Sequence, residues 1–174
     1  MMFNINTKKF NLLTALLLAV TLIWTAPTLS QEFINSTTSK QVSADYKKQV
    51  DCLAETIYYE AGSESYEGKL SVAQIVLNRV NNPKYPKDIC SVVYQKYNGI
   101  YQFSWIGLIT NKSIKNKYQW EESLLIANKA LTEPYLHDLI YKTNSLYYHA
   151  VYINPGWKLK RTTQIGNHIF YSEI

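Results

Sequence analysis

The chain has 174 residues, a formal net charge of +5 at pH 7, and 47% hydrophobic against 18% charged residues. This length suits one domain with a short extension and is too short for two full-sized domains. The apolar content excludes a wholly disordered chain, and two cysteines exclude both a disulfide-dense miniprotein and a Cys-only zinc site. Fifteen tyrosines are many for this length. A phenol ring has an apolar body and a polar tip, which suits a solvated cleft as well as ordinary packing.

The first thirty residues predict a secretory signal peptide. Lys8 and Lys9 precede an apolar run from Leu12 to Trp24, and Pro27 and a small-residue end at Ser30 follow. This is the order of n-region, h-region and cleavage site. An uncleaved signal anchor is the alternative, although the run is shorter than the roughly 18 residues of a membrane-spanning helix.

Cleavage after Ser30 would remove two of the 18 basic residues and none of the 13 acidic ones, which lowers the net charge from +5 to +3. This charge is too small to indicate a nucleic-acid partner, although it suits an anionic polymer outside the cell. We expect an exported monomer in the periplasm, in the cell envelope or outside the cell, with no stable membrane span once the signal is removed.

Residues 31–44 are rich in Ser, Thr and Gln and predict a polar linker, followed by one domain at 45–174. A helix is predicted from Asp45, with Ser43 as its N-cap and Gly62 as its terminator. Its apolar residues have the spacing of one helix face: Val50, Leu53, Ala54, Ile57 and Ala61.

A second helix is predicted after Ser65, which can cap it, and it ends at Asn82-Pro83. Shorter helices are predicted at 88–96 and at 120–131. The inward residues of the second helix are Leu70, Ala73, Ile75, Val76, Leu77 and Val80, and those of the last helix are Leu124, Ala127 and Leu131.

The last third of the chain changes character. Residues 145–153 and 162–171 are rich in aromatic and β-branched residues and predict two strands. Asn154-Pro155-Gly156 marks a turn between them, and Gly166-Asn167 a turn or bulge inside the second. Helices followed by a small antiparallel sheet predict an α+β fold in which helix dominates.

Glu60 is the most informative polar residue. It lies seven positions after Leu53 and therefore on the apolar face of the first helix, whereas Glu55 falls on the opposite, solvated side. Loss of hydration raises the pKa of a carboxyl group, and glycosidic bond cleavage requires a protonated acid. The alternative is a structural glutamate paired to a buried arginine such as Arg79. Glu64 could supply a second carboxylate, but it lies beyond Gly62, the predicted end of the helix, so the spacing does not place it on the same face as Glu60.

The histidines do not form a known metal-binding motif. His137, His149 and His168 show neither an H-E-x-x-H nor a short i, i+4 arrangement, and no Cys or Asp completes a ligand set. His149 and His168 could meet across the hairpin, but two ligands do not define a site. The G-x-S-x-G elbow of a serine hydrolase is also missing. We expect no metal and no cofactor.

Several motifs follow one another along the domain. They are CLAETIYYEA at 52–61 with Glu64 and Gly68, VAQIVLNRV at 72–80, Tyr85-Pro86, Ile89-Cys90, VVYQ at 92–95, Gln102-Phe103-Ser104, and a tail from Tyr147-Tyr148-His149 through Asn154-Pro155 and Trp157 to IGNHIFY at 165–171. In this combination the sequence resembles the cell-wall hydrolase family of the SleB/CwlJ spore cortex-lytic type. The resemblance runs from about Cys52 to Tyr171, essentially the whole domain.

This resemblance implies a lysozyme- or lytic-transglycosylase-like domain that cleaves peptidoglycan. The functional acid of the family is the first Glu of an E-A-R-G-E motif, which falls on Glu60, and the second Glu falls on Glu64. In the transglycosylase-like mechanism one Glu protonates the glycosidic oxygen and then acts as base on the muramic acid 6-hydroxyl, so a second carboxylate is not obligatory. The motif lacks its arginine here, since Gly62-Ser63 stands in place of Arg-Gly. Glycine cannot reproduce the hydrogen bonds of a guanidinium group, which matters if that arginine binds substrate or orients the second Glu.

The same resemblance implies a disulfide between Cys52 and Cys90. Many exported members of the family that the chain resembles carry four cysteines, one of them directly before the Q-F-S motif, where this chain has Tyr101. Loss of one bridge leaves these two cysteines to pair with each other, and two buried free thiols are the alternative. We expect sugar contacts, with packing as the alternative role, from Tyr94, Gln95, Gln102, Phe103, Tyr147 and Trp157.

The sequence therefore predicts an exported enzyme that cleaves the glycan strand of peptidoglycan, as a muramidase or lytic transglycosylase, with Glu60 as general acid/base. Two alternatives stay open. One is a non-catalytic peptidoglycan-binding module, which the missing arginine makes plausible. The other is an N-acetylmuramoyl-L-alanine amidase, which the lack of a zinc motif disfavours.

Overall fold

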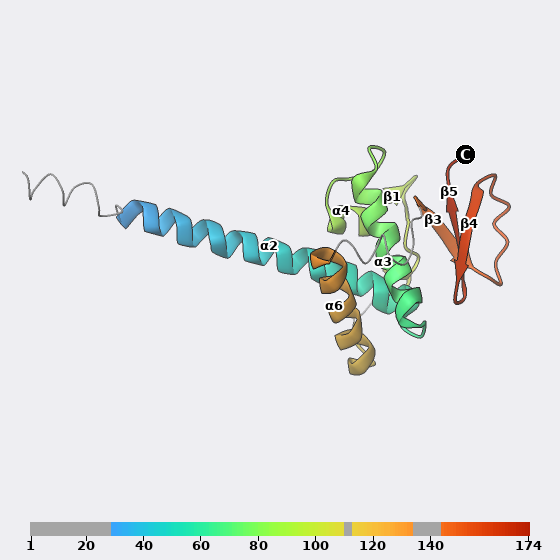
Figure 1. The fold of residues 1–174 in the computed structure, drawn as a ribbon, viewed down its shortest axis with the longest axis horizontal. Coiled ribbons are helices and arrows are strands. Elements are labelled where there is room, and N and C mark those ends of the chain that lie inside the picture. The colour runs from blue at the N-terminus through green and yellow to red at the C-terminus, as the bar shows by residue number, and fades with distance from the viewer. Residues whose placement is uncertain (1–28, 110–112, 134–143) are drawn as a thin grey trace, which may run out of the picture. The chain divides into compact units, whose positions relative to one another are not determined.

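The computed structural model describes residues 29–109, 113–133 and 144–174 (Figure 1). The chain forms two compact units, residues 1–43 and residues 44–174. The predicted signal peptide lies outside the described residues except for its last two positions, and its cleavage stays a prediction, as do the predicted domain boundaries. No helix in the described part is long and apolar enough to cross a membrane.

The predicted start of the first helix is wrong. Helix α2 (Leu29–Ala61) begins sixteen positions before Asp45, and the Ser43 hydroxyl donates to the Lys40 carbonyl inside the helix (2.9 Å) instead of capping it. Neither Gly nor Pro interrupts this stretch, so nothing in the sequence stops the helix from running through the predicted linker. The linker side chains that the structure describes are exposed, as their polar composition indicates.

The apolar face predicted for α2 is confirmed and forms part of the core. Leu53, Ala54 and Ile57 are fully buried, and Val50 and Ala61 are nearly so. Burying an aliphatic side chain of the size of leucine stabilises a fold by about 1.5–3 kcal/mol. The face on which Glu60 was placed from the spacing is therefore the face around which the domain assembles.

Helix α3 (Tyr66–Asn81) begins and ends where the sequence predicts. The Ser65 hydroxyl accepts from the Gly68 N–H (3.3 Å) as the N-cap, and the chain leaves the helix at Asn82 before the proline. The helix contacts α4, α6 and β4. Of its predicted inward residues, Leu70, Ala73, Ile75 and Val76 are buried, and Leu77 and Val80 are half-buried.

Helix α4 (Ile89–Val93) is shorter than predicted, and Asp88 caps it by accepting from the Ser91 N–H (2.9 Å). The predicted disulfide is confirmed: Cys52 in α2 and Cys90 in α4 are bonded across a sequence separation of 38 residues. The bridge therefore holds the helix that carries Glu60 to the segment that follows α3.

Three short elements were not predicted. Strands β1 (Lys96–Tyr97) and β2 (Ile100–Tyr101) form an antiparallel hairpin, and helix α5 (Trp105–Leu108) follows. Asn98 and Gly99 in the hairpin turn both have positive φ, 51° and 81°, as a two-residue type I′ turn requires. The Asn-Gly pair was a hairpin signal in the sequence.

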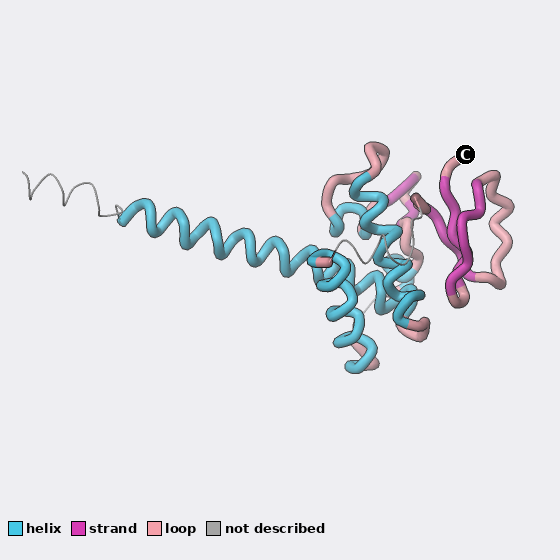
Figure 2. Tube along the Cα trace, viewed as in Figure 1, coloured by secondary structure: helices cyan, strands magenta, loops and turns pink. Residues whose placement is uncertain are grey.

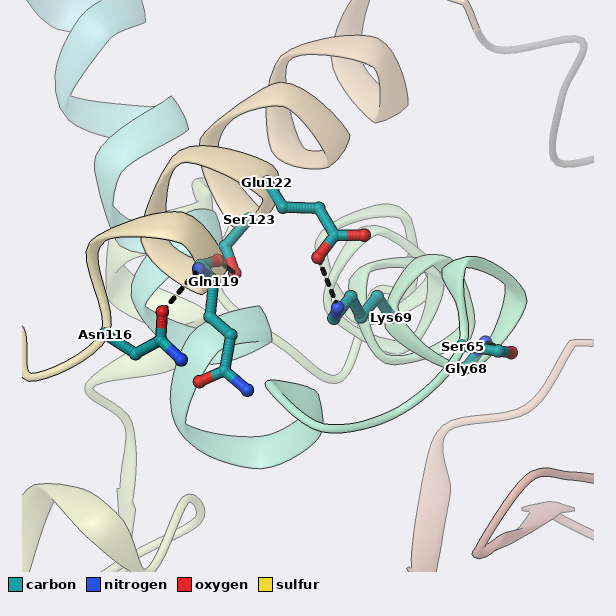
Figure 3. A network of polar contacts seen from close by, with 7 residues as sticks. All are labelled: Ser65, Gly68, Lys69, Asn116, Gln119, Glu122 and Ser123. Atoms are coloured by element: carbon teal, nitrogen blue, oxygen red, sulfur yellow. Dashed lines mark hydrogen bonds and ion pairs between the residues drawn. The ribbon is translucent and has the colours of Figure 1, made fainter.

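Helix α6 (Lys117–Thr132) packs against α3 and starts three positions before its predicted beginning. Figure 3 shows the ion pair between the two helices, Lys69 Nζ to Glu122 Oε2 at 2.6 Å, and the Asn116 side chain accepting from the Gln119 N–H at the start of α6. Lys69 is only 4% exposed, so loss of Glu122 alone would leave a buried, unpaired charge. Among the predicted inward residues of α6, Ala127 is buried and Leu124 and Leu131 are half-buried.

The C-terminal sheet contains β3 (Tyr147–Ala150), β4 (Lys160–Ile165) and β5 (His168–Ser172) in the antiparallel order β3-β5-β4 (Figure 2). The single strand predicted at 162–171 is thus two strands, because the chain reverses at Gly166-Asn167. Gly166 has a φ of +53°, at the first central position of the turn, where type II′ hairpins place glycine. Helices followed by a small antiparallel sheet confirm the predicted α+β class.

The register of the sheet separates two aromatic faces. Tyr148 is opposite Phe170, and Ala150 is opposite His168, so these residues share one face. Tyr147 is opposite Tyr171 and shares the other face with His149. The Tyr148 ring contacts both His168 and Phe170, with centroids at 5.1 and 5.8 Å.

Candidate active site

A cleft of ≈ 620 Å³ brings together parts of the chain that are distant in sequence. Its lining comes from the end of α2, from α3, from residues 102–108, from β3 and the loop that follows it, and from His168. The volume lies in the range typical of ligand sites. Among the described lining residues, Glu60 is the one carboxylate.

Glu60 is half-buried in this cleft, and its Oε2 accepts a hydrogen bond from the Tyr148 hydroxyl at 2.8 Å. Burial raises the pKa of Glu60 above its usual value, while the Tyr148 hydrogen bond and the positive charge of Arg79 lower it by less. The raised pKa confirms what the position on the apolar helix face predicts. The carboxyl group is therefore shifted toward its protonated form, while the Tyr148 hydroxyl and the charge of Arg79 are in place to stabilise the carboxylate.

Arg79 is held rigidly beside the cleft and is 6% exposed. Its Nε donates to the Leu146 carbonyl (2.9 Å). Its guanidinium group lies over the rings of Tyr85 and Phe103, at 5.5 and 5.4 Å from their centroids, a cation–π arrangement that fixes the charged plane. Its Nη1 is buried and has no hydrogen-bond partner among the described residues. Arg79 thus acts on Glu60 through its electrostatic field, and its best-defined hydrogen bond is to the backbone.

Tyr148 was not predicted as a site residue. Burial raises the pKa of its hydroxyl well above the ordinary value, and the neighbouring Glu60 raises it further, so the group stays a proton donor. The sequence singled out Tyr147, which the alternation of β3 places on the opposite face of the sheet. Strand alternation alone says which residues share a face, but not which face meets the helices.

Glu64 does not line the cleft that contains Glu60. Its Oε1 accepts from the Asn167 side-chain amide (2.9 Å) and its Oε2 from the Asn167 backbone N–H (3.2 Å). Burial raises the pKa of Glu64, but the two hydrogen bonds from Asn167, with weaker attraction to His168 and Lys69, together lower it below its usual value. A Cβ on Gly166 would lie 2.1 Å from Glu64 Oε2. The carboxylate thus holds the turn after α2 to the β4–β5 turn.

Four of the six predicted sugar contacts line the cleft: Gln102, Phe103, Tyr147 and Trp157. Gln95 lines a second cleft of ≈ 350 Å³, which shares Gln102 and Tyr147 with the first. Tyr94 lines neither of these clefts, and its hydroxyl donates to Glu55. Glu55 was expected on the solvated side of the helix, but its side chain is half-buried.

The two described histidines lie on opposite faces of the sheet, so they do not meet as the hairpin suggested. His149 stacks on Tyr171 and its Nε2 is 3.0 Å from that hydroxyl. His168 is 7% exposed, and burial lowers its pKa below the usual value. His137 lies outside the described residues. Within the described ranges, no group of three or more His, Cys, Asp or Glu is arranged to hold a metal ion.

The profile of the Cell Wall Hydrolase family matches residues 63–171 of the chain. The chain belongs to this family. The matched region contains Glu64 and all of the C-terminal sheet except Ser172, and it begins three residues after Glu60. Family membership is thus established by a segment that does not include Glu60, and the catalytic role of Glu60 stays a prediction.

Relatives of this Cell Wall Hydrolase chain include the spore cortex-lytic enzyme of Oceanobacillus iheyensis, which is 26% identical over 149 residues, 81% of this chain and 48% of that protein. The chain spans between 14% and 48% of the length of the curated relatives described as spore cortex-lytic enzymes.

Two solved structures share the fold. The catalytic domain of the Bacillus cereus SleB protein is 23% identical, with a TM-score of 0.50 over 72% of this chain and 91% of that one. The catalytic domain of the germination-specific lytic transglycosylase SleB from Bacillus anthracis is 22% identical, with a TM-score of 0.51 over 71% of this chain and 93% of that one. The predicted fold class, mainly helical and lysozyme-like with a small C-terminal sheet, is confirmed.

Proposed function

We propose that this member of the Cell Wall Hydrolase family is an exported enzyme that cleaves the glycan strand of peptidoglycan, with Glu60 as general acid and then general base. The observation that carries the proposal is a carboxyl group of raised pKa in a cleft lined by aromatic rings and the Gln102 amide. The Bacillus anthracis protein of the same fold is described as a lytic transglycosylase. Export depends on the predicted signal peptide, and the monomeric state stays a prediction.

The environment of Glu60 suits a group that first gives a proton away and later takes one back. Burial favours the protonated carboxyl group before reaction, so it can protonate the glycosidic oxygen as the bond breaks. The carboxylate that remains is stabilised by the Tyr148 hydroxyl at 2.8 Å and by the charge of Arg79. These two groups are already in place and need no rearrangement when the charge develops.

A lytic transglycosylase fits the cleft better than a two-carboxylate hydrolase. Glycosidases that use water commonly need two carboxyl groups on opposite sides of the scissile bond. Glu60 has no such partner among the described lining residues, because Glu64 bonds to Asn167 instead. With one carboxylate, Glu60 would return as base to deprotonate the 6-hydroxyl of muramic acid, which attacks C1 and gives a 1,6-anhydro end.

Glu64 is therefore assigned a supporting role in this proposal. Its two hydrogen bonds to Asn167 fix the β4–β5 turn, and β5 contains His168 in the cleft wall. The proposed sugar contacts are Gln102, Tyr147 and Trp157, since amides bind hydroxyls and aromatic faces stack on sugar rings. Phe103 is 2% exposed and packs in the core against Arg79, which is the alternative role expected for it.

The missing arginine of the E-A-R-G-E motif changes the local turn. A Cβ on Gly62 would lie 2.5 Å from the Tyr58 carbonyl oxygen, so this backbone has no room for a side chain at that position. Arg79, on the next helix, places a positive charge beside Glu60. We infer that the cleft operates without the motif arginine.

Product analysis tests this function. The purified chain is incubated with peptidoglycan and the soluble products are identified by mass spectrometry. We expect 1,6-anhydromuramic ends. Reducing ends would instead indicate a muramidase, released peptides an amidase, and sedimentation with the wall without products a binding module.

The variants Glu60→Gln and Glu55→Gln form a matched pair on the same helix. Both replace a half-buried glutamate that accepts a tyrosine hydrogen bond, and both amides keep an acceptor oxygen. Only Glu60→Gln is expected to stop product formation. Equal products from Glu60→Gln and wild type would refute the assignment of Glu60.

A further inference from the structure

A second cleft adjoins the proposed catalytic cleft and has no role in the bond-breaking step. It has a volume of ≈ 350 Å³ and is lined by Lys84, Tyr85, Gln95, Tyr97, Gln102 and Tyr147. Gln102 and Tyr147 form walls of both clefts. A ligand bound beside Glu60 can therefore extend a branch into the second cleft.

We propose that this second cleft binds the acidic stem peptide that muramic acid carries on its lactyl group. The inference rests on the proposed function, because it assumes that a muramic acid residue occupies the first cleft. In peptidoglycan the peptide branches from this sugar, so a cleft for the peptide must open beside the cleft for the sugar. The shared walls at Gln102 and Tyr147 provide this arrangement.

The chemistry of the lining suits a peptide with free carboxylates. Gln95 and Gln102 each offer a primary amide, which can donate and accept at once as a peptide bond does. Lys84 adds a positive charge, for which a neutral sugar has no counterpart. Three tyrosines provide rings and hydroxyls on the remaining walls.

Lys84 is available to a ligand although it already has an ion pair. Its Nζ is 2.7 Å from Glu173 Oε2, and the two side chains are 64% and 38% exposed. Exposed pairs of this kind are weakly held, and an ammonium group has three donors, of which Glu173 uses one. Glu173 is itself engaged, because its other oxygen accepts from the Tyr147 hydroxyl (3.3 Å).

Arg79 marks the point where a branch would leave the sugar. It lines the first cleft, and the ring of Tyr85 that lies over its guanidinium group lines the second. Its buried Nη1 has no partner among the described residues, and a buried N–H donor without an acceptor is costly. The carbonyl oxygen of the lactyl group, which joins the sugar to the peptide, is an acceptor of the required kind.

Titration of the purified full chain with soluble probes, followed by NMR, tests the proposal. The probes are the tripeptide L-Ala-γ-D-Glu-L-Lys, the same peptide with its carboxyl groups amidated, and the neutral saccharide chitotetraose. We expect the acidic peptide to bind and its amidated form to bind about two- to fivefold more weakly, as loss of one exposed ion pair implies.

Two variants locate the binding site. Lys84→Ala and Tyr97→Ala remove exposed side chains that line only the second cleft, so both should fold. Each is expected to weaken binding of the acidic peptide about two- to fivefold and to leave chitotetraose binding unchanged. The matched controls are Lys117→Ala and Tyr118→Ala, exposed residues of α6 that line neither cleft, and they should change neither affinity.

The proposal would be overturned if the wild type did not bind the acidic peptide, or if it bound the amidated form equally well. It would also be overturned if Lys84→Ala and Tyr97→Ala lost chitotetraose binding in parallel with peptide binding, because the cleft would then be a saccharide subsite. None of these results bears on Glu60, because binding needs no bond cleavage. Conversely, wild-type activity in Glu60→Gln would refute the proposed function without affecting the peptide titration.

Discussion

The hydrogen bond between Tyr148 and Glu60 gives the most specific prediction about the proposed acid. The Tyr148 hydroxyl donates to Glu60 Oε2 at 2.8 Å across 88 residues of sequence. Tyr148→Phe removes this donor and keeps the ring contacts with His168 and Phe170. The substitution therefore acts on the protonation of Glu60 more than on the packing of the sheet.

The direction and size of the pKa change at Glu60 follow from the form of Glu60 that the hydrogen bond stabilises. The hydrogen bond favours the carboxylate and so lowers the pKa of Glu60, and its loss must raise that pKa further. A hydrogen bond to a charged group contributes about 1.5–3 kcal/mol, and 1.36 kcal/mol corresponds to one pH unit. The basic limb of the pH–rate profile should therefore move about one to two pH units higher. The plateau rate should fall, because a weaker acid protonates the leaving oxygen less readily.

The pH dependence of kcat/KM for solubilisation of peptidoglycan measures this shift. Tyr147→Phe is the matched control: Tyr147 is the neighbouring tyrosine of β3, and its hydroxyl donates to Glu173 instead. The control should leave the basic limb in place even if KM changes. An unchanged limb in Tyr148→Phe, or a move to lower pH, would refute the assigned role of the hydrogen bond.

Three further predictions concern stability. Replacement of Cys52 and Cys90 by serine should lower the free energy of unfolding in urea by about 4 kcal/mol at most, the chain-entropy value for the 38-residue separation; an unchanged urea midpoint would contradict this. Gly166→Ala should lower the free energy of unfolding by at least about 1–2 kcal/mol, because φ is +53° and the new Cβ would meet Glu64 at 2.1 Å. The control is Gly107→Ala, whose Cβ would meet nothing closer than 3.8 Å, and it should leave the free energy of unfolding nearly unchanged in the same urea assay. Since burial lowers the pKa of His168, the unfolded chain binds a proton that the folded chain resists, so the free energy of unfolding should fall between about pH 7 and pH 5, and His168→Phe should reduce that slope.

Local patterns in the sequence predicted the elements that depend on periodicity and caps. The apolar spacing in α2 placed Glu60 on the core face and predicted the direction of its pKa shift. Ser65 and Asn82 correctly marked the two ends of α3. The start of α2 was predicted wrongly, because Ser43 is equally compatible with an N-cap and with a helix interior, where its hydroxyl donates to a carbonyl one turn earlier.

The partners of Glu60 could not be predicted, because they come from contacts between distant segments. Tyr148 reaches Glu60 only after β3 pairs with β5 and one face of the sheet turns toward the helices. Glu64 and Asn167 are 103 residues apart, and nothing local in the sequence joins them. The β1–β2 hairpin is different, since its Asn98-Gly99 turn is a local hairpin signal in the sequence.

Whether Glu60 alone cleaves the glycan strand is decided by the release of soluble glycan from peptidoglycan, measured side by side for Glu60→Gln and Glu64→Gln. Both variants remove one carboxylate of the same motif. We predict that Glu60→Gln lowers the rate by about 10²–10⁴-fold, the usual contribution of a general acid or base, and that Glu64→Gln remains active at temperatures at which it stays folded. Wild-type rates in Glu60→Gln, or loss of activity in a folded Glu64→Gln, would show that Glu60 is not the one catalytic carboxylate.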